Sequence, residues 1–266
     1  MGKIRALQSK KERQTTGMTL VEGERLVGDT LREGVNLESV VATAEVWARR
    51  VDLVHACATA GIQTLVATPK QFDFLATTDH PSGMLAVAAC PVWREEQIWA
   101  KAQGETFFGT LLVALQDPGN FGTLVRTLAA AGGSGMWVSE GNTESASPKA
   151  VRASAGAVFH LPVVSEADPL RVIKRCRERG VQCLAAAPRQ GRPHTSLDLT
   201  KPSLLVLGGE GGGLPTEVIG ACDQRVQIPM PGEVESLNVA TAGAILMFEG
   251  VRQRRLAQGA DRRNKS

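Results

Sequence analysis

The sequence contains no tyrosine, and only 4% of its 266 residues are aromatic. A surface that holds splayed nucleic-acid bases mainly by aromatic stacking is therefore not expected. The five cysteines are scattered and form no Cys-x-x-Cys pair, and the four histidines lack the spacing of metal ligands. These patterns argue against a zinc centre or any other metal site and against a disulfide framework. They favour reduced thiols in the cytoplasm.

Long apolar runs are also missing. No stretch of about 18 apolar residues occurs, and the N-terminus lacks the apolar segment of a signal peptide. The sequence therefore predicts no membrane span. A hydrophobic fraction of 43% is enough for a folded core. The net charge is only +3, but the basic residues gather at both ends, where they suit a polyanion or simply face water.

Apolar strands and amphipathic helices alternate along the chain, which predicts an α/β fold with mostly parallel sheets. We expect a first domain at residues 1–90, a polar linker at residues 91–106 and a second domain at residues 107–266. In the first domain, strands are expected at 37–43, 63–67 and 84–90, and helices at 23–33, 46–60 and 69–76, with residues 19–23 leading into the first helix. In the second, strands are expected at 110–115, 135–139, 158–164, 182–187, 204–207 and 224–228, and helices at 121–131, 148–153, 169–178, 214–222 and 237–255.

A glycine-rich loop at residues 208–213 follows the apolar strand expected at residues 204–207. Glycine lets a ligand approach the bare backbone, because it has no Cβ. A phosphate loop is excluded, since the carboxylate of Glu210 would repel phosphate and no Lys-Ser or Lys-Thr pair follows. The dinucleotide fingerprint is excluded too, because Leu214 takes the place of its last glycine. The loop suits a ligand that is neutral or cationic near the backbone.

A second segment, residues 115–126, combines Asp-Pro-Gly-Asn turn chemistry with the start of a helix. Gly122 and Arg126 are four residues apart and share a helix face, so the glycine leaves room beside the guanidinium. Taken alone, Asn120 is a turn former or a helix cap, and Arg126 is a solvated side chain.

Three segments together match a known family. They are Asn-x-Gly-x-x-x-Arg at 120–126, Gly-Gly-Glu-Gly-x-Gly at 208–213, and Ile-Pro-Met at 228–230 followed by Ser-Leu-Asn-Val at 236–239. With them, residues 107–255 resemble the SpoU (TrmH-like) branch of the SPOUT RNA methyltransferases, and so does the block at 147–157. The first ninety residues resemble the family's ribosomal-protein-like RNA-binding domain, at Glu22-Gly23 and at residues 81–84.

The resemblance implies an RNA 2′-O-ribose methyltransferase that uses S-adenosylmethionine. It also implies a homodimer and a C-terminal SPOUT α/β domain with a deep trefoil knot. Ribosomal RNA of the 23S type is the expected substrate. Transfer RNA is one alternative, and a non-catalytic ribosome-assembly factor that kept the fold is another.

The same resemblance assigns residues to roles. The cofactor would lie against Leu207, Gly208, Gly209, Ile228, Met230 and Leu237. Methyl transfer would involve Asn120, Arg126, Glu210, Ser236 and Asn238. Contacts to RNA would come from Lys149 and Arg152, which could equally face water.

The sequence leaves two roles open for Arg126. A ribose hydroxyl is a poor nucleophile until a base or oriented dipoles weaken its proton. An arginine ordinarily keeps its own proton, so Arg126 is either an unusual base or a clamp on the neighbouring phosphate. Asn120 would hold Arg126 or the ribose, and Glu210 would orient the loop and the arginine. Ser236 is expected to cap the last helix or to position the reactants.

Overall fold

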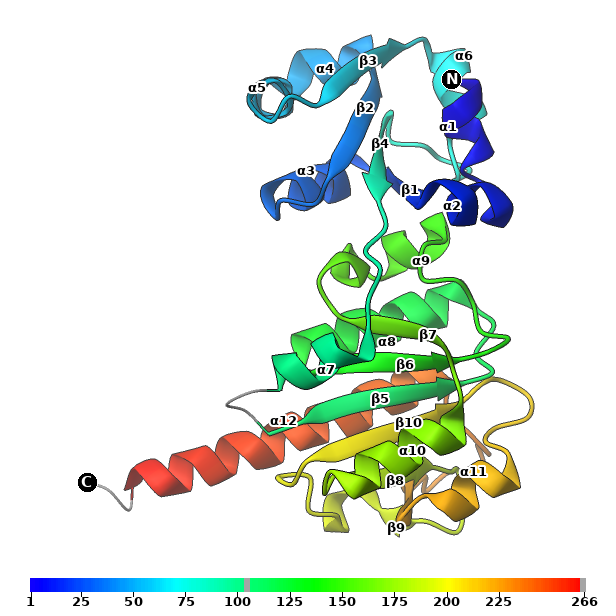
Figure 1. Cartoon of the computed structure of the whole chain (residues 1–266), viewed down its shortest axis with the longest axis vertical. Helices are drawn as coiled ribbons and strands as arrows, with labels where there is room; N and C mark the ends of the chain where they lie inside the picture. The colour runs from blue at the N-terminus through cyan, green and yellow to red at the C-terminus, as the bar shows by residue number, and fades with distance from the viewer. Residues whose placement is uncertain (103–105, 264–266) are drawn as a thin grey trace. The chain divides into compact units, whose positions relative to one another are not determined.

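The computed structural model describes residues 1–102 and 106–263 (Figure 1). The chain divides into two compact units. The first combines Met1–Val92 with Glu144–His160, and the second combines Trp93–Thr143 with the chain from Leu161 onward. Within the described residues, no helix has both the length and the apolar character needed to cross a bilayer.

The first unit is built on a four-stranded sheet in the order β1-β4-β2-β3, in which only β2 and β3 run parallel. Its strands are β1 (Met18–Glu22), β2 (Leu37–Thr43), β3 (Gln63–Ala67) and β4 (Met84–Ala89). Its helices are α1 (Gly2–Ala6), α2 (Lys10–Thr16), α3 (Glu24–Arg32), α4 (Ala44–Arg49), α5 (Val51–Thr59), α6 (Pro69–Leu75) and α9 (Pro148–Ala153), with the short 3₁₀ helix η1 (Ala157–Phe159).

Segment 144–160 packs with the first unit although it follows part of the second in the chain. Arg13, whose side chain is only 5% exposed, forms an ion pair of 2.6 Å with Glu144. The hydroxyl of Thr19 donates to the carbonyl of Ala146 at 2.6 Å, and α9 packs against β1. The expected continuous second domain at 107–266 therefore differs from the observed division. The buried guanidinium of Arg13 is stabilised by a carboxylate, and that carboxylate belongs to Glu144, which is distant in the sequence.

Two sequence expectations for the first unit were wrong. Residues 19–23 were expected to lead into a helix, but they lie in and just after β1, which pairs antiparallel with β4. The helix expected at 46–60 is two helices, α4 and α5, because Arg50 leaves the helical conformation at φ −110° and ψ 51°. The expected strand at 37–43 matches β2.

The second unit holds a seven-stranded sheet in the order β7-β6-β5-β10-β8-β11-β9, and every neighbouring pair is parallel. This confirms the predicted α/β class with a mostly parallel sheet. The strands are β5 (Phe108–Val113), β6 (Gly135–Ser139), β7 (Val163–Ala167), β8 (Gln182–Ala186), β9 (Arg192–Pro193), β10 (Ser203–Gly208) and β11 (Gln224–Gln227).

Helices cover both faces of this sheet, as Figure 1 shows with α10 in front and α12 behind. On one face lie α7 (Glu95–Lys101), α10 (Pro169–Glu178) and α11 (Thr216–Ala221). On the other lie α8 (Pro118–Ala130) and α12 (Val239–Arg263), which pack against each other. Strands buried on both faces are mostly apolar, and all six residues of β5 are buried, including the polar Thr110.

Two further expectations for the second unit need correction. Residues 103–105 of the linker expected at 91–106 lie outside the described residues. The described part contains α7, whose Ile98 is fully buried in the core together with Trp137 and Val172. In place of the strand expected at 158–164, the chain forms η1 up to Phe159 and enters β7 only at Val163. Gly156, at φ 85°, turns the chain between α9 and η1.

Candidate active site

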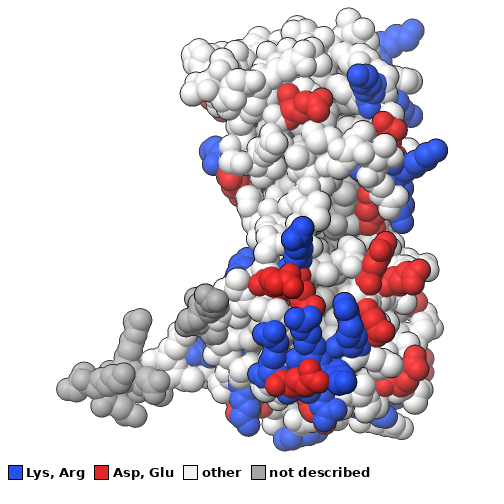
Figure 2. Space-filling model, viewed as in Figure 1, with Lys and Arg blue, Asp and Glu red and all other residues white. Residues whose placement is uncertain are grey.

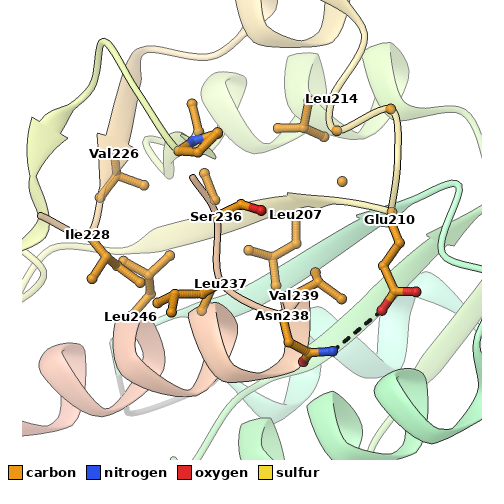
Figure 3. Close-up of a pocket in the computed structure, with 18 of the residues that line it drawn as sticks. Leu207, Glu210, Leu214, Val226, Ile228, Ser236, Leu237, Asn238, Val239 and Leu246 are labelled. Carbon is orange, nitrogen blue, oxygen red and sulfur yellow. Dashed lines mark hydrogen bonds between the residues drawn. The ribbon is translucent and has the colours of Figure 1, made fainter. Parts of the chain in front are cut away.

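A cleft of about 680 Å³ opens in the second unit where β8 and β10 end. Ligands of parallel α/β sheets bind beyond the carboxyl ends of the strands, so this is the expected place for a site. The cleft is lined by the glycine loop after β10, by the segment after β11 and by the start of α12 (Figure 3). Every predicted cofactor-binding residue lies in its wall: Leu207, Gly208, Gly209, Ile228, Met230 and Leu237.

The first two glycines of the loop are needed by the loop itself. A Cβ on Gly209 would lie 2.0 Å from the carbonyl oxygen of Ala114, and a Cβ on Gly208 would lie 2.3 Å from the carbonyl carbon of Gly213. The amide of Gly209 donates to the carbonyl of Val113 at 2.8 Å. The glycines therefore let the loop fold back against the end of β5. The sequence interpretation, in which they clear space for a ligand, captures only part of their role.

The walls of the cleft are apolar. Leu207, Val226, Ile228, Leu237 and Leu246 surround it in Figure 3. Among the described residues that line it, Glu210 is the only one with a charged side chain.

Glu210 belongs to a cluster that joins all three sequence motifs. The amide of Asn120 donates to its carboxylate, and the amide of Asn238 donates to the same oxygen at 3.4 Å (Figure 3). The amide of Asn238 also donates to the side-chain oxygen of Asn120 at 3.0 Å. The structure therefore brings together three of the five residues predicted for methyl transfer.

Helix capping explains why these asparagines sit where they do. Asp117, not Asn120, caps α8, since its carboxylate accepts from the amide of Asn120 at 2.7 Å. Asn238 caps α12 by accepting from the amides of Ala240 and Thr241 at 2.9 and 3.2 Å. The expectation that Ser236 caps the last helix was wrong, because α12 begins three residues later. Ser236 is exposed and lines the cleft.

Arg126 lies on the third turn of α8, because the helix begins earlier than expected, at Pro118. Its side chain is exposed, and among residues 1–102 and 106–263 it has no hydrogen-bond or ion-pair partner. Asn120 was expected to hold either Arg126 or the ribose. Within the described residues its side chain bonds Glu210 and Asn238, and no bond to Arg126 is formed. The guanidinium thus keeps its five donors for another molecule.

The two residues predicted to contact RNA lie on α9, in the first unit. Lys149 is exposed. Arg152 is half-buried and donates to the hydroxyl of Thr77 at 3.2 Å. Thr77 also donates its hydroxyl to the buried carboxylate of Glu22. Arg152 is therefore part of a polar network within the first unit.

Sequence reasoning missed the wall that comes from β8 and α12. Ala186, Ala187, Pro188 and Leu246 line the cleft, and their small or apolar side chains give no motif. The strand expected at 182–187 could have indicated them, because ligands bind beyond the carboxyl ends of parallel strands. In the part of the chain that the structure describes, no three His, Cys, Asp or Glu side chains gather as metal ligands would.

Close packing of α8 on α12 sets the geometry of the cluster. A Cβ on Gly243 would lie 2.3 Å from the Cδ2 atom of Leu124 and 3.1 Å from the Cδ1 atom of Leu207. Gly243 thus allows close contact between helices of the same chain. Because α8 carries Asn120 and α12 begins next to Asn238, this packing holds the two amides in reach of each other.

Comparisons with known proteins agree with this geometry. Residues 109–248 match the SpoU rRNA Methylase family, and residues 2–86 match the MRM3-like substrate binding domain. The chain is similar to the 23S rRNA (guanosine(2553)-2'-O)-methyltransferase RlmP of Bacillus subtilis, with 30% identity over 243 residues that cover 91% of this chain and 92% of RlmP.

Solved structures resemble the whole chain. One is the SpoU methyltransferase AviRb from Streptomyces viridochromogenes in complex with AdoMet, with a TM-score of 0.82 and 28% identity over 95% of this chain and 97% of that one. Another is the AdoMet-bound rRNA methyltransferase from Sinorhizobium meliloti, with a TM-score of 0.81 and 29% identity over 94% of this chain and 93% of that one. These likenesses confirm the predicted SPOUT-type α/β fold. The chain belongs to the SpoU rRNA Methylase family.

Proposed function

We propose that this protein transfers the methyl group of S-adenosylmethionine to a ribose 2′-hydroxyl of ribosomal RNA of the 23S type. The observation that carries the proposal is the cleft: apolar walls, a glycine loop, and Glu210 as the only charged side chain among the described residues that line it. S-adenosylmethionine has no phosphate and carries a positive sulfonium, so a cleft wall without basic side chains suits it around the sulfur. Two similar structures hold AdoMet, and the relative RlmP is named for 2′-O methylation of 23S rRNA.

The residues around the cleft fit this cofactor. Leu207, Ile228 and Leu237 supply apolar contacts, and the backbone of Gly208 and Gly209 supplies hydrogen-bonding groups without a side chain in the way. When bound, the cofactor supplies an electrophilic methyl group. The protein's own part is to place a ribose hydroxyl in line with it, which provides much of the rate.

The cluster of Asn120, Glu210 and Asn238 positions the reactants. Its hydrogen bonds fix the start of α8 and the start of α12 beside the cleft. Arg126 projects from the same helix as Asn120 and has no partner among the described residues. We assign Arg126 the role of contacting the RNA at the reacting ribose. It acts either by binding the adjoining phosphate and polarising the hydroxyl or by taking the proton.

A homodimer completes the proposal. Phe248 on α12 is 49% exposed although it is a large apolar residue, and Ile245 and Val251 of that helix are also partly exposed. A second copy of the chain would bury this part of α12. Sedimentation equilibrium of wild type and Phe248→Glu tests it, and a wild-type monomer contradicts it.

The first unit is proposed to bind the RNA substrate, with Lys149 of α9 among its contacts. The match of residues 2–86 to a substrate binding domain supports this role. Action on ribosomal RNA also implies a cytoplasmic protein.

Two measurements test the proposed function. Calorimetry should detect S-adenosylmethionine binding at micromolar concentrations, and absence of heat at high micromolar cofactor favours a non-catalytic assembly factor. Transfer of a labelled methyl group to ribosomal and transfer RNA from cells that lack this gene then identifies the substrate. Labelling of transfer RNA alone contradicts the ribosomal assignment.

The variant Arg126→Ala tests the assigned residue. We expect it to lose at least about 100-fold in methyl transfer while its cofactor affinity stays within about threefold of wild type. Arg225→Ala, which removes an exposed arginine of the same unit, is the matched control. Loss of cofactor binding in Arg126→Ala shows that the residue is misassigned.

A further inference from the structure

Helix α10 has a strongly basic outer face. Val172, Ile173 and Cys176 are buried in the core of the second unit, so they define its inner face. Arg171, Lys174 and Arg175 are spaced three and four residues apart, which places them together on the opposite face. Arg179, the residue that follows the helix, is exposed in the same row. Figure 2 shows Lys and Arg side chains gathered over α10.

Only part of this charge is neutralised. Arg175 forms an ion pair of 2.9 Å with Glu95, and Arg177 forms one of 3.0 Å with Asp223. Lys174 reaches Glu178 only at 4.0 Å, with its side chain 79% exposed. Within residues 1–102 and 106–263, Arg171 and Arg179 have no carboxylate partner. Three cations, Arg171, Lys174 and Arg179, are therefore available for an anionic ligand.

The stability of the helix does not explain this arrangement. Basic residues near the carboxyl end of a helix are favourable, which accounts for Arg175 and Arg177. Arg171, however, lies in the first turn, where the helix dipole favours a negative side chain, and the carboxylate at this end is that of the cap Asp168, which accepts from the amides of Leu170 and Arg171. A charge placed against the dipole on an exposed surface is better explained by a ligand than by folding.

Arg179 is held ready for such a ligand. Its guanidinium stacks over the ring of Trp99, 4.4 Å from the centroid. Trp99 is fixed in turn by a bond of 3.1 Å from its indole nitrogen to Glu95. Stacking leaves the N–H groups in the plane of the guanidinium free to donate outward, which suits phosphate oxygens.

We propose that Arg171, Lys174 and Arg179 form a second RNA contact surface, which binds phosphates of the RNA backbone. The surface lies on the face of the sheet covered by α10, whereas α8 and α12 with the asparagine cluster cover the other face. It binds without base specificity, since it offers cations and no groups that read base edges. The inference rests on the proposed RNA substrate, because it extends the path of that RNA beyond the catalytic cleft.

The test is the salt dependence of RNA binding by the full-length protein. The triple variant R171Q/K174Q/R179Q is compared with wild type on poly(U) and on purified 23S ribosomal RNA. Each phosphate contact contributes roughly 0.7 to 0.9 to the slope of log K against log salt, so the variant's slope should be about 2 shallower. Its affinity at about 0.1 M salt should fall at least about tenfold on both RNAs.

The triple variant R192Q/K201Q/R225Q is the matched control. It removes the same charge from exposed positions of the same unit that do not belong to α10. We expect it to keep most of the wild-type slope, and both triple variants should bind S-adenosylmethionine as wild type does. Coincident slopes for wild type and the α10 variant overturn the inference, as does an equal loss in the control.

The result is independent of the proposed activity. If no RNA accepts a methyl group but the α10 variant has the shallower slope, the proposed function fails and the contact surface stands. If methyl transfer is intact and the slopes coincide, the contact surface alone is wrong.

Discussion

The side-chain amide of Asn238 donates to the side-chain oxygen of Asn120 at 3.0 Å, which ties the start of α12 to the first turn of α8. Both amides also donate to the carboxylate of Glu210 in the glycine loop. Segments separated by up to 118 residues therefore meet in one cluster at the edge of the cofactor cleft. The carboxylate of Glu210 accepts from both amides, so the cluster can be tested by changing this one side chain.

The variant Glu210→Gln should slow methyl transfer about 10- to 100-fold, because a glutamine amide adds a competing donor beside the amides of Asn120 and Asn238 and disturbs the cluster that positions the reactants. Its melting temperature should change little, since Glu210 is exposed. Single-turnover methyl transfer measures the effect. Glu233→Gln is the control, because this carboxylate of a nearby loop is exposed and unpaired among the described residues. A wild-type rate for Glu210→Gln removes Glu210 from the proposed site.

Two glycines of the loop, Gly209 and Gly212, should respond differently to substitution by alanine. A Cβ on Gly209 meets the carbonyl oxygen of Ala114 at 2.0 Å, whereas a Cβ on Gly212 meets nothing within 4 Å. Gly209→Ala should lower the free energy of unfolding by about 2 kcal/mol and weaken cofactor binding at least about tenfold. Gly212→Ala should change stability by less than about 0.5 kcal/mol. Urea unfolding and calorimetry measure both, and equal destabilisation contradicts the proposed packing of the loop on β5.

The ion pair of Arg13 with Glu144 should be strongly coupled, since their side chains are only 5% and 16% exposed. Arg13→Gln leaves the Glu144 carboxylate without its partner and removes donors from the carbonyls of Leu7 and Gln8. We expect each single variant, Arg13→Gln or Glu144→Gln, to lose about 3 kcal/mol, and the double variant to lose clearly less than the sum.

The exposed pair of Arg25 with Asp29 provides the comparison, because Arg25→Gln should cost less than about 0.5 kcal/mol. Additive losses in the Arg13 and Glu144 variants would show that the pair does not hold residues 144–160 on the first unit. Deletion of residues 1–90 is a poor test of RNA binding, since α9 packs against β1 and would lose that cover.

Periodicity and turn chemistry predicted the parallel sheet well, because strands buried on both faces have a clear apolar pattern. Strands at 135–139 and 63–67 and the helix at 169–178 were predicted to the residue. The first strand was missed because it is short, at residues 18–22, and is followed by a glycine that also suits a helix start. Its pairing with β4 is set by residues far along the chain.

The cleft residues could be predicted only because three motifs occur together. No local pattern shows that Asn120, Glu210 and Asn238 meet, since their contact depends on α8 packing on α12 through Gly243. The cap of α12 was assigned to Ser236 because serine is a good capping residue, but Asn238 performs that function. Residues 144–160 could not be assigned to the first unit, because the partner of Glu144 is a single arginine near the N-terminus.

Glu249 on α12 should make stability depend on pH in the acid range. Its side chain is 8% exposed, and hydrogen bonds from Arg252 at 2.7 Å hold the pKa of its carboxyl at about 2 instead of the usual 4.5. Gln253 assists by donating to the same carboxylate at 2.8 Å. Because the folded pKa lies below the unfolded one, the stabilisation is fully present above about pH 5. It is lost as the pH falls towards about 2.

Glu249→Gln should therefore lower the free energy of unfolding by about 2 kcal/mol at neutral pH and by much less near pH 2. Urea titrations from about pH 2 to 7 give the free energy of unfolding of wild type and variant at each pH. The contributions of the other carboxyl groups cancel in the difference. Glu217→Gln on α11 is the control, because Glu217 is exposed and has no ion pair among the described residues. A difference that is constant with pH means that Glu249 acts by packing and that its charge contributes nothing to stability.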